Sequence, residues 1–197
     1  MQEKAVRRSN TERARATRKA LVEAARRLFV EKSYADTATP DIVTAAGVTR
    51  GALYHHFADK QALFRAVVEE EAASVAEEIE RATPAALSAK DALLAGGEAF
   101  LAAMALPGRT RLLLLDGPAV LGRAVMDRID GKHSARTLKE GLSMAMKEGK
   151  MKKVPLDALT ALLSATFDRA ALAIEAGTTR QEVNSALGAV IEGLFVE

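Results

Sequence analysis

The sequence predicts an all-α fold of about nine helices. Ala and Leu dominate the composition, aromatic residues make up only 4%, and five Pro interrupt the 197 residues. Such a composition favours helices over sheets. Apolar side chains recur at steps of three and four residues along most of the chain, and no segment alternates convincingly with a period of two.

Charge divides the chain into two parts. Residues 1–60 hold 12 Lys and Arg against 7 Asp and Glu, which gives +5, whereas residues 61–197 hold 16 against 19, which gives −3. This asymmetry favours a basic head for a polyanion, followed by a more neutral body. A solvated basic tail explains the same charges, so charge alone leaves both interpretations open.

The N-terminal segment is predicted to be a flexible basic arm over residues 1–10, followed by a helix from Thr11. One face of this helix is apolar, and the helix should end near Lys32, before Ser33-Tyr34-Ala35-Asp36. The residues on that face are Leu21, Ala24, Ala25, Leu28 and Phe29.

Two short helices and a longer one should follow. Thr39-Pro40-Asp41 is a strong helix start, in which Thr39 can cap and Pro40 suits the first turn. Gly47 suits the left-handed conformation of a sharp turn. Thr49 is predicted to cap a third helix to about Phe57, and a fourth should run from an Asp59 cap to about Arg81.

The rest of the chain, residues 63–197, reads as a helical body behind a head at residues 11–62. Helical patterns cover roughly residues 88–106, 109–116 and 118–149, the last with a possible split near Gly131. Two amphipathic helices close the chain, at about 156–176 and 179–196. Their apolar stripes could be buried within the monomer or could form a two-fold interface.

A short helix, a Gly turn and a second short helix form a helix-turn-helix pattern. In this motif the second helix enters the major groove and presents its N-terminal residues to base edges. Here they are Thr49, Arg50, Gly51 and Ala52. Arg50 can donate two hydrogen bonds to guanine, and the Ala52 methyl could touch a thymine methyl.

Three further residues are candidates for phosphate contacts. Tyr54 and His55 lie further along the third helix, and Lys60 lies at the start of the fourth. Contacts of this kind position a protein on DNA without reading its sequence.

The stretch from Thr39 to Phe57, followed by Lys60, Leu63 and Phe64, resembles the DNA-binding domain of the TetR family of repressors. The resemblance covers about fifty residues and combines a Gly turn, an aromatic–His–Phe ending and a Lys at fixed offsets. It implies DNA contacts at the positions Thr39, Thr49, Arg50, Gly51, Tyr54, His55 and Lys60.

The same resemblance implies an all-helical homodimer with a ligand-binding body and an interface through the two C-terminal helices. The implied function is a repressor that a small-molecule effector releases from a pseudo-palindromic operator in double-stranded DNA. Residues 112–122 resemble one branch of the family's bodies, for which no common ligand is implied.

Five residues of the body are candidates for a ligand cavity, although surface exposure or ordinary core packing explains each of them as well. Phe100, Met104 and Met144 could adapt around an apolar ligand, and Asp116 and His133 are polar groups near apolar helices.

The sequence lacks the residues and motifs that several classes of enzyme and metalloprotein require. The chain has no Cys and no His-Glu-x-x-His, Gly-x-Ser-x-Gly or phosphate-loop motif. We therefore expect no enzyme activity, no metal and no cofactor. The longest apolar run, residues 99–107, is too short to span a bilayer, and no signal peptide is recognisable, so a cytoplasmic location is expected. The alternative function is a helical small-molecule-binding protein without specific operator binding, and a weaker one is a helical enzyme.

Overall fold

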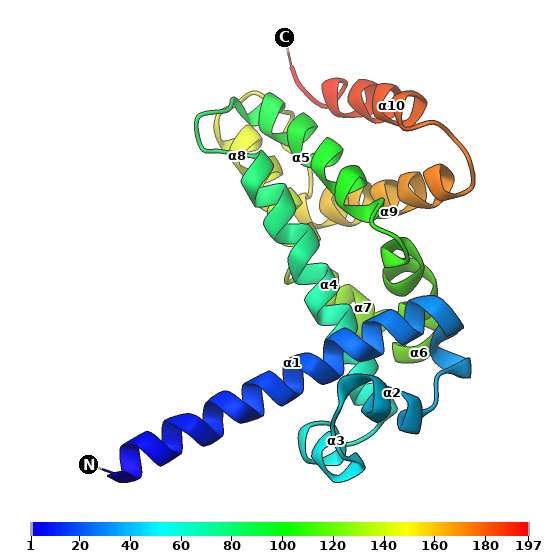
Figure 1. Cartoon of the computed structure of the whole chain (residues 1–197). Helices are drawn as coiled ribbons and strands as arrows, with labels where there is room; N and C mark the ends of the chain where they lie inside the picture. The colour runs from blue at the N-terminus through cyan, green and yellow to red at the C-terminus, as the bar shows by residue number, and fades with distance from the viewer. Residues whose placement is uncertain (1, 197) are drawn as a thin grey trace. The chain divides into compact units, whose positions relative to one another are not determined.

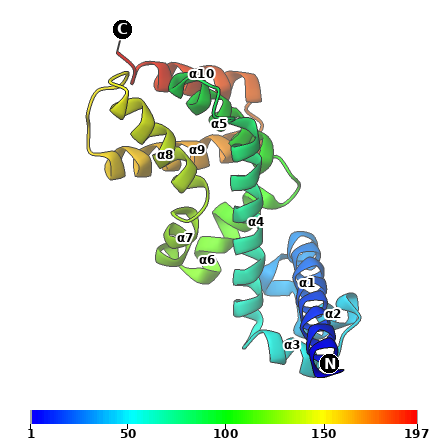
Figure 2. The same ribbon diagram turned by 90° about the vertical axis from the view of Figure 1, so that its left-hand side faces the viewer.

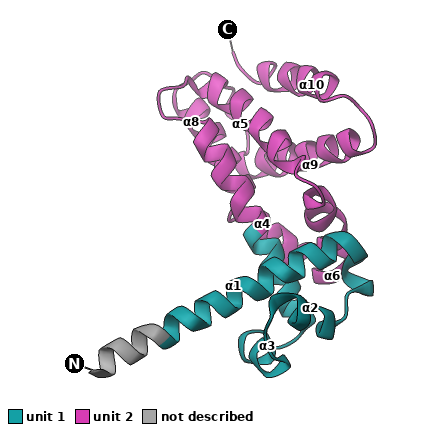
Figure 3. Ribbon diagram, viewed as in Figure 1, with its two compact units in different colours: residues 1–70 teal, residues 71–197 magenta. Residues whose placement is uncertain are grey.

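The computed structural model describes the backbone of residues 2–196 and the side chains of residues 10–196. The chain forms two compact units, residues 1–70 and 71–197, which are coloured separately in Figure 3. The sequence placed the boundary after residue 62. In the structure it falls later, within the helix α4 (Lys60–Ala82), because the first half of that helix packs with the first unit.

The first helix, α1 (Gln2–Asp36), is longer than the sequence predicted. A flexible arm was expected over residues 1–10, whereas the helix begins at Gln2 and only Met1 of that arm lies outside the described residues. No Gly or Pro occurs in residues 2–32 to interrupt the helix. Helical geometry breaks at Ser33, with φ 85° and ψ 164°, next to the predicted end at Lys32.

The first unit is completed by α2 (Thr39–Ala46), α3 (Arg50–His56) and the start of α4. Figure 1 shows α2 and α3 beside the C-terminal half of α1. Phe29 of α1 meets Phe64 of α4 edge to face at 5.2 Å between ring centroids. The large side chains without exposed surface in this core include Leu21, Phe29, Ile42, Leu53 and Phe64. Burial of this apolar surface fixes the two short helices, which could not persist alone.

The second unit contains more helices than expected. Residues 2–196 hold ten α-helices and one π-helical segment, against the predicted total of about nine. The difference arises in residues 109–149, where Gly122 has φ 82° and separates two short helices. The elements after α4 are α5 (Ala89–Met104), the π-helix η1 (Arg111–Asp116), α6 (Gly117–Leu121), α7 (Arg123–Asp130), α8 (Ser134–Lys147), α9 (Leu156–Glu175) and α10 (Arg180–Glu192).

Helix α5 lies at the centre of the second unit and packs against α8, α9 and α10, an arrangement visible in Figures 1 and 2. Thr179 and Glu182 form a capping box at the start of α10. Beyond the last helix, Phe195 pairs with Met151 in an isolated antiparallel bridge. Within residues 2–196 there is no β-strand, and none of the helices carries an apolar stretch that could cross a membrane.

Candidate nucleic-acid interface and ligand cavity

The turn between α2 and α3 forms as the sequence predicted. Gly47 adopts φ 65° and ψ 31°, and its N–H donates to the carbonyl oxygens of Thr44 and Val43 at the end of α2. A left-handed residue is required there, and glycine adopts it without a steric cost. The start of α2 differs in one detail: Ala38 is the N-cap and Thr39 is already helical. Pro40 occupies the first turn, as expected.

Helix α3 begins with the predicted cap. The Thr49 hydroxyl oxygen accepts a hydrogen bond from the backbone N–H of Ala52 at 3.2 Å, which satisfies one of the unpaired donors of a helix N-terminus. The hydroxyl therefore stabilises the helix, and its own hydrogen remains available for donation. This geometry places Arg50 and Gly51, both exposed, in the first turn of the helix.

One face of α3 is free of the core and carries the predicted DNA-binding side chains. Arg50, Gly51, Tyr54 and His55 are exposed, and Tyr54 retains 44% of its surface. The Arg50 guanidinium lies 5.5 Å from the centroid of the Tyr54 ring, a cation–π arrangement that aligns the two side chains. On the opposite face, Leu53 is fully buried. The helix therefore presents a polar, cationic surface on a rigid base.

Lys60 has intramolecular contacts that the sequence did not reveal. Its Nζ donates to the backbone oxygens of Tyr34 at 2.9 Å and Thr37 at 3.0 Å, and it lies 4.3 Å from the Tyr34 ring centroid. Two of its three donors are thus used to hold the end of α1 to the start of α4. As predicted, Asp59 caps α4 by accepting from the N–H of Ala62 at 2.7 Å.

The two adjacent histidines of α3, His55 and His56, differ in burial, and this affects the protonation of His56. Burial lowers the pKa of His56, and the positive charges of His55 and Arg18 lower it further. Neutral His56 therefore predominates near pH 7. The rings of His55 and His56 lie 5.3 Å apart at a steep angle. Within the described residues, no group of three or more metal-ligating side chains forms.

The second unit contains a partly open cavity of about 350 Å³ lined by α4, α5, α8, α9 and the segment that follows α4. Its wall is mainly apolar, and this size and character are typical of small-molecule sites. The predicted candidates Phe100 and Met144 both line it. The sequence missed Gly97 and Phe167, because contacts between residues seventy positions apart leave no local signal. Gly97 provides space for the ring: a Cβ there would lie 2.8 Å from a Phe167 ring carbon.

The other three ligand candidates lie elsewhere. Met104 lines two smaller cavities, of about 200 and 140 Å³. Asp116 and His133 line none of the three cavities found in the described residues. Asp116 instead pairs with Arg111 at 3.3 Å, and His133 precedes α8 as its N-cap residue. The Asp116 Oδ2 atom is buried and accepts no hydrogen bond within the described residues, and the His133 side chain forms no capping hydrogen bond.

The cavity of 140 Å³ has a charged wall that the sequence did not indicate. Arg123, Asp127, Asp130 and Asp168 line it together with apolar side chains. Burial raises the pKa of Asp130, against hydrogen bonds from Ser164 and the backbone of residue 135 that lower it. Buried carboxylates with perturbed pKa values in a cavity are typical of functional sites.

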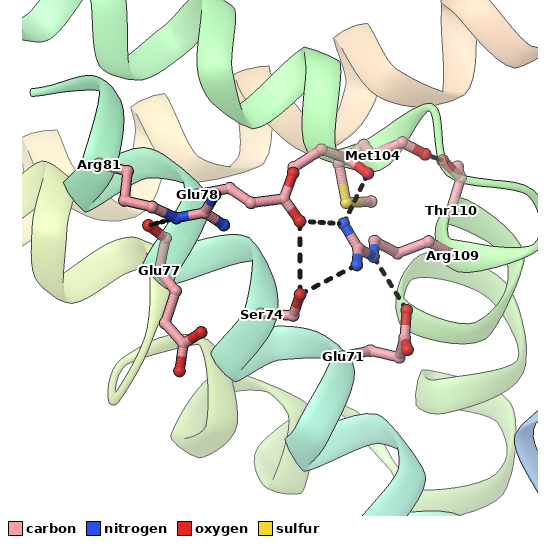
Figure 4. A network of polar contacts seen from close by, with 9 residues as sticks. Glu71, Ser74, Glu77, Glu78, Arg81, Met104, Arg109 and Thr110 are labelled. Atoms are coloured by element: carbon pink, nitrogen blue, oxygen red, sulfur yellow. Dashed lines mark hydrogen bonds and ion pairs between the residues drawn. The ribbon is translucent and has the colours of Figure 1, made fainter. Parts of the chain in front are cut away.

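A buried polar network fixes α4 within the second unit (Figure 4). Arg109, whose side chain is only 4% exposed, donates to Glu71 at 2.9 Å, to Glu78 at 3.0 Å and to the Ser74 hydroxyl at 3.1 Å. A fourth hydrogen bond reaches the backbone oxygen of Ala103 at 2.8 Å. The three partners on α4 lie on one helix face, so a single arginine fastens that face to the segment after α5.

Comparisons with known proteins agree with this arrangement. The family described as bacterial regulatory proteins, tetR family, matches residues 21–67, and the tetracyclin repressor-like C-terminal domain matches residues 90–196. The first match covers the helix-turn-helix and the second covers most of the unit that holds the cavities. The two models together therefore account for both parts of the chain.

Individual relatives support the same assignment. The transcriptional repressor AcnR of Corynebacterium glutamicum is 43% identical over 61 residues, which are 31% of this chain and 32% of the relative. The regulator TtgR of Pseudomonas putida is 44% identical over 62 residues, which are 32% of this chain and 30% of the relative. These alignments span about a third of each relative.

Similarity to solved structures extends over nearly the whole chain. A TetR-family transcriptional regulator of Pectobacterium atrosepticum has a TM-score of 0.74 and 29% identity, and the match covers 94% of this chain and 97% of that one. The helix-turn-helix, the helical second unit and the two family models lead to one assignment. The chain belongs to the TetR family of bacterial regulatory proteins.

Proposed function

We propose that the protein is a transcriptional repressor that binds a pseudo-palindromic operator in double-stranded DNA through α3. The observation that carries the proposal is the exposed face of α3, where Arg50 and Gly51 lie in the first turn behind the Thr49 cap. A helix N-terminus with an exposed arginine suits the major groove, because a guanidinium can donate two hydrogen bonds to a guanine edge. Tyr54 and His55 on the same face suit phosphate contacts.

Operator binding can be tested by gel shift with the intergenic DNA that flanks the gene. We expect specific binding that weakens steeply with salt, since phosphate contacts release counterions. Arg50→Ala should weaken it about 10- to 100-fold, the cost of about 1–3 kcal/mol for one bidentate base contact. Arg65→Ala is the matched control, because Arg65 is an exposed arginine in the same unit, paired with Glu69. Absence of specific binding by the wild-type dimer would favour a small-molecule-binding protein without operator recognition.

We also propose that the protein acts as a homodimer through α9 and α10. The apolar stripes noted in the sequence are largely buried within the monomer, as Leu163, Phe167 and Leu187 show. A second face remains exposed: Leu162 retains 68% and Val190 48% of their surface. Exposed alanines surround both residues: Ala158, Ala161, Ala165, Ala186 and Ala189. Small residues let helices approach closely, so this face suits a four-helix interface between two copies.

The release step is assigned to the cavity of 350 Å³ in the second unit. A small molecule bound there shifts the protein between two arrangements only if its affinity for them differs. Helix α4 contributes residues to both units, and its Ile79 and Glu80 line the cavity. Displacement of α4 by the ligand is therefore the proposed route to altered spacing of the two α3 helices in the dimer. Such a repressor would act in the cytoplasm, where the chromosomal operator lies.

A further inference from the structure

We propose that the effector is a hydrophobic cation. Its apolar part occupies the cavity of 350 Å³, and its ammonium or amidinium group enters the cavity of 140 Å³ beside Asp168. The inference rests on the proposed function, because it names the chemical class of the effector that the second unit would bind.

The two cavities are neighbours that share part of their walls. Phe100 and Ser134 line both of them. The Phe100 ring stacks edge to face on Phe167 at 5.8 Å, and Phe167 borders the larger cavity. A ligand that reaches past Phe100 therefore touches both spaces, and an aromatic ring can turn aside by a change of rotamer.

The larger cavity suits an apolar group. Leu93, Leu138 and Met144 are among its lining residues. Its two carboxylates, Glu80 and Glu140, share Arg136 as their ion-pair partner, which leaves a formal charge of −1, and their side chains are 50% and 64% exposed. Water and salt screen exposed charges, so this part of the wall attracts a ligand cation less than the more buried carboxylates of the smaller cavity do.

The smaller cavity has an excess of negative charge. Its charged lining residues are Asp127, Asp130, Asp168 and Arg123. Three carboxylates face one guanidinium, so the fully ionised wall has a formal charge of −2. The remaining lining is mainly apolar, and a partly desolvated site strengthens the attraction between such a wall and a ligand cation.

Asp168 is the carboxylate available to a ligand. Asp130 already accepts hydrogen bonds from the Ser164 hydroxyl at 2.7 Å and from the N–H of Ala135 at 3.2 Å. By contrast, no hydrogen bond or ion pair to Asp168 occurs among the side chains described, residues 10–196, and only the charge of Arg123 attracts it. The third carboxylate, Asp127, is exposed to water. A half-buried carboxylate without a hydrogen-bond partner is costly, and a cationic ligand would satisfy it.

The protonation of Asp168 gives the site a pH dependence. Burial raises the pKa of Asp168 to about 7, and the negative charges of Asp130 and Asp127 raise it while Arg123 lowers it. A cation binds the ionised form. An amine that stays protonated should therefore bind about tenfold tighter at pH 8 than at pH 6, since a pKa near 7 leaves only about a tenth of the sites ionised at pH 6.

The test measures binding of three probes of equal shape to the full-length protein by calorimetry: 4-phenylbutylamine, 4-phenylbutan-1-ol and 4-phenylbutanoate. We expect the amine to bind at least tenfold tighter than the alcohol at pH 8, and the carboxylate to bind most weakly. Asp168→Asn should remove the preference for the amine and leave the affinity for the alcohol unchanged. Asp157→Asn on the same helix is the matched control, because the Asp157 side chain is 86% exposed.

The inference would be overturned by any of three results. The amine does not bind, the three probes bind with equal affinity, or the preference for the amine survives Asp168→Asn. A gel shift with operator DNA separates this outcome from failure of the proposed function. If the amine binds through Asp168 but DNA is never bound specifically, the repressor function fails and the cation site stands. If DNA is bound specifically and no cation preference exists, only the cation site fails.

Discussion

The Arg109 Nε donates to a Glu71 carboxylate oxygen at 2.9 Å, with both side chains almost completely buried. The two residues are 38 positions apart, and their pair fixes the second unit's part of α4 to the segment that follows α5. Buried ion pairs stabilise a structure only weakly relative to apolar replacements, but removal of one partner leaves an uncompensated charge. The pair therefore makes the position of α4 sensitive to single substitutions.

Arg109→Met should destabilise the second unit by about 3–5 kcal/mol, because Glu71 and the half-buried Glu78 lose their cation. Urea unfolding of the full-length protein, with hydrogen exchange of the α4 amides, measures the loss. Arg136→Met is the control: Arg136 pairs with Glu140 at the surface, and we expect less than about 1 kcal/mol. Equal losses in the two variants would contradict a special role for the buried network.

Lys60→Met should destabilise the first unit by about 1–3 kcal/mol, since the hydrogen bonds of a charged donor to Tyr34 and Thr37 are lost. Hydrogen exchange of the α2 and α3 amides reports this local loss. Lys19→Met is the control, as Lys19 is highly exposed. Unchanged protection, together with a salt slope of operator binding reduced by about 0.9, would instead show that Lys60 acts only as a phosphate contact.

The first unit was largely predictable because its signals are local. The glycine at position 47, the Thr49 cap and the Asp59 cap each act within four residues, and all three form as predicted. Lys60 marks the limit: its position was correct, but its bonds to carbonyl groups 26 and 23 positions away could not be inferred from the sequence.

The second unit was less predictable, because its site depends on long-range packing. Phe100 and Met144 were identified as cavity residues by their adaptable apolar side chains, a property that many core residues share. Gly97 and Asp168 were missed, since only the folded helices bring Gly97 to Phe167 and Asp168 to Asp130. The buried Arg109 network also joins segments with no pattern in common.

Gly97→Ala should reduce the affinity of the larger cavity for an apolar ligand by about tenfold, equivalent to about 1.4 kcal/mol. The new methyl group would lie 2.8 Å from a ring carbon of Phe167, so the ring must move, and it borders the cavity. Titration with the neutral fluorescent probe N-phenyl-1-naphthylamine measures the change. Gly188→Ala is the matched control, because the nearest atom, Cδ2 of Leu94, lies 4.0 Å away. A variant that binds the probe as wild type does would show that the cavity tolerates the ring's displacement.

Asp168→Asn should stabilise the ligand-free protein, and increasingly so as the pH rises. Burial raises the folded-state pKa of Asp168 to about 7, well above the ordinary pKa of an aspartate. The wild type therefore loses stability as pH rises from about 4 to 7 and keeps that penalty above pH 7. Removal of the ionisable group removes the penalty. We expect little difference from wild type at pH 4 and about 4 kcal/mol at pH 8, measured by urea unfolding, since the pKa is raised by about three units and each corresponds to about 1.4 kcal/mol. A constant difference across this range would mean that Asp168 titrates normally.

Leu162→Glu should convert the protein to a monomer and abolish operator binding at concentrations where the wild type binds. Leu162 is 68% exposed in the monomer and lies among exposed alanines of α9, so a carboxylate there would be buried without a partner in a dimer. Because most of the Leu162 side chain is exposed within its own chain, the substitution should change the free energy of unfolding of the monomer by less than about 0.5 kcal/mol. Lys152→Glu, an exposed charge change outside α9 and α10, is the control. Sedimentation velocity measures the oligomeric state. A variant that remains dimeric would place the interface on another surface, and a monomer that still binds the full operator with wild-type affinity would remove the need for a dimer.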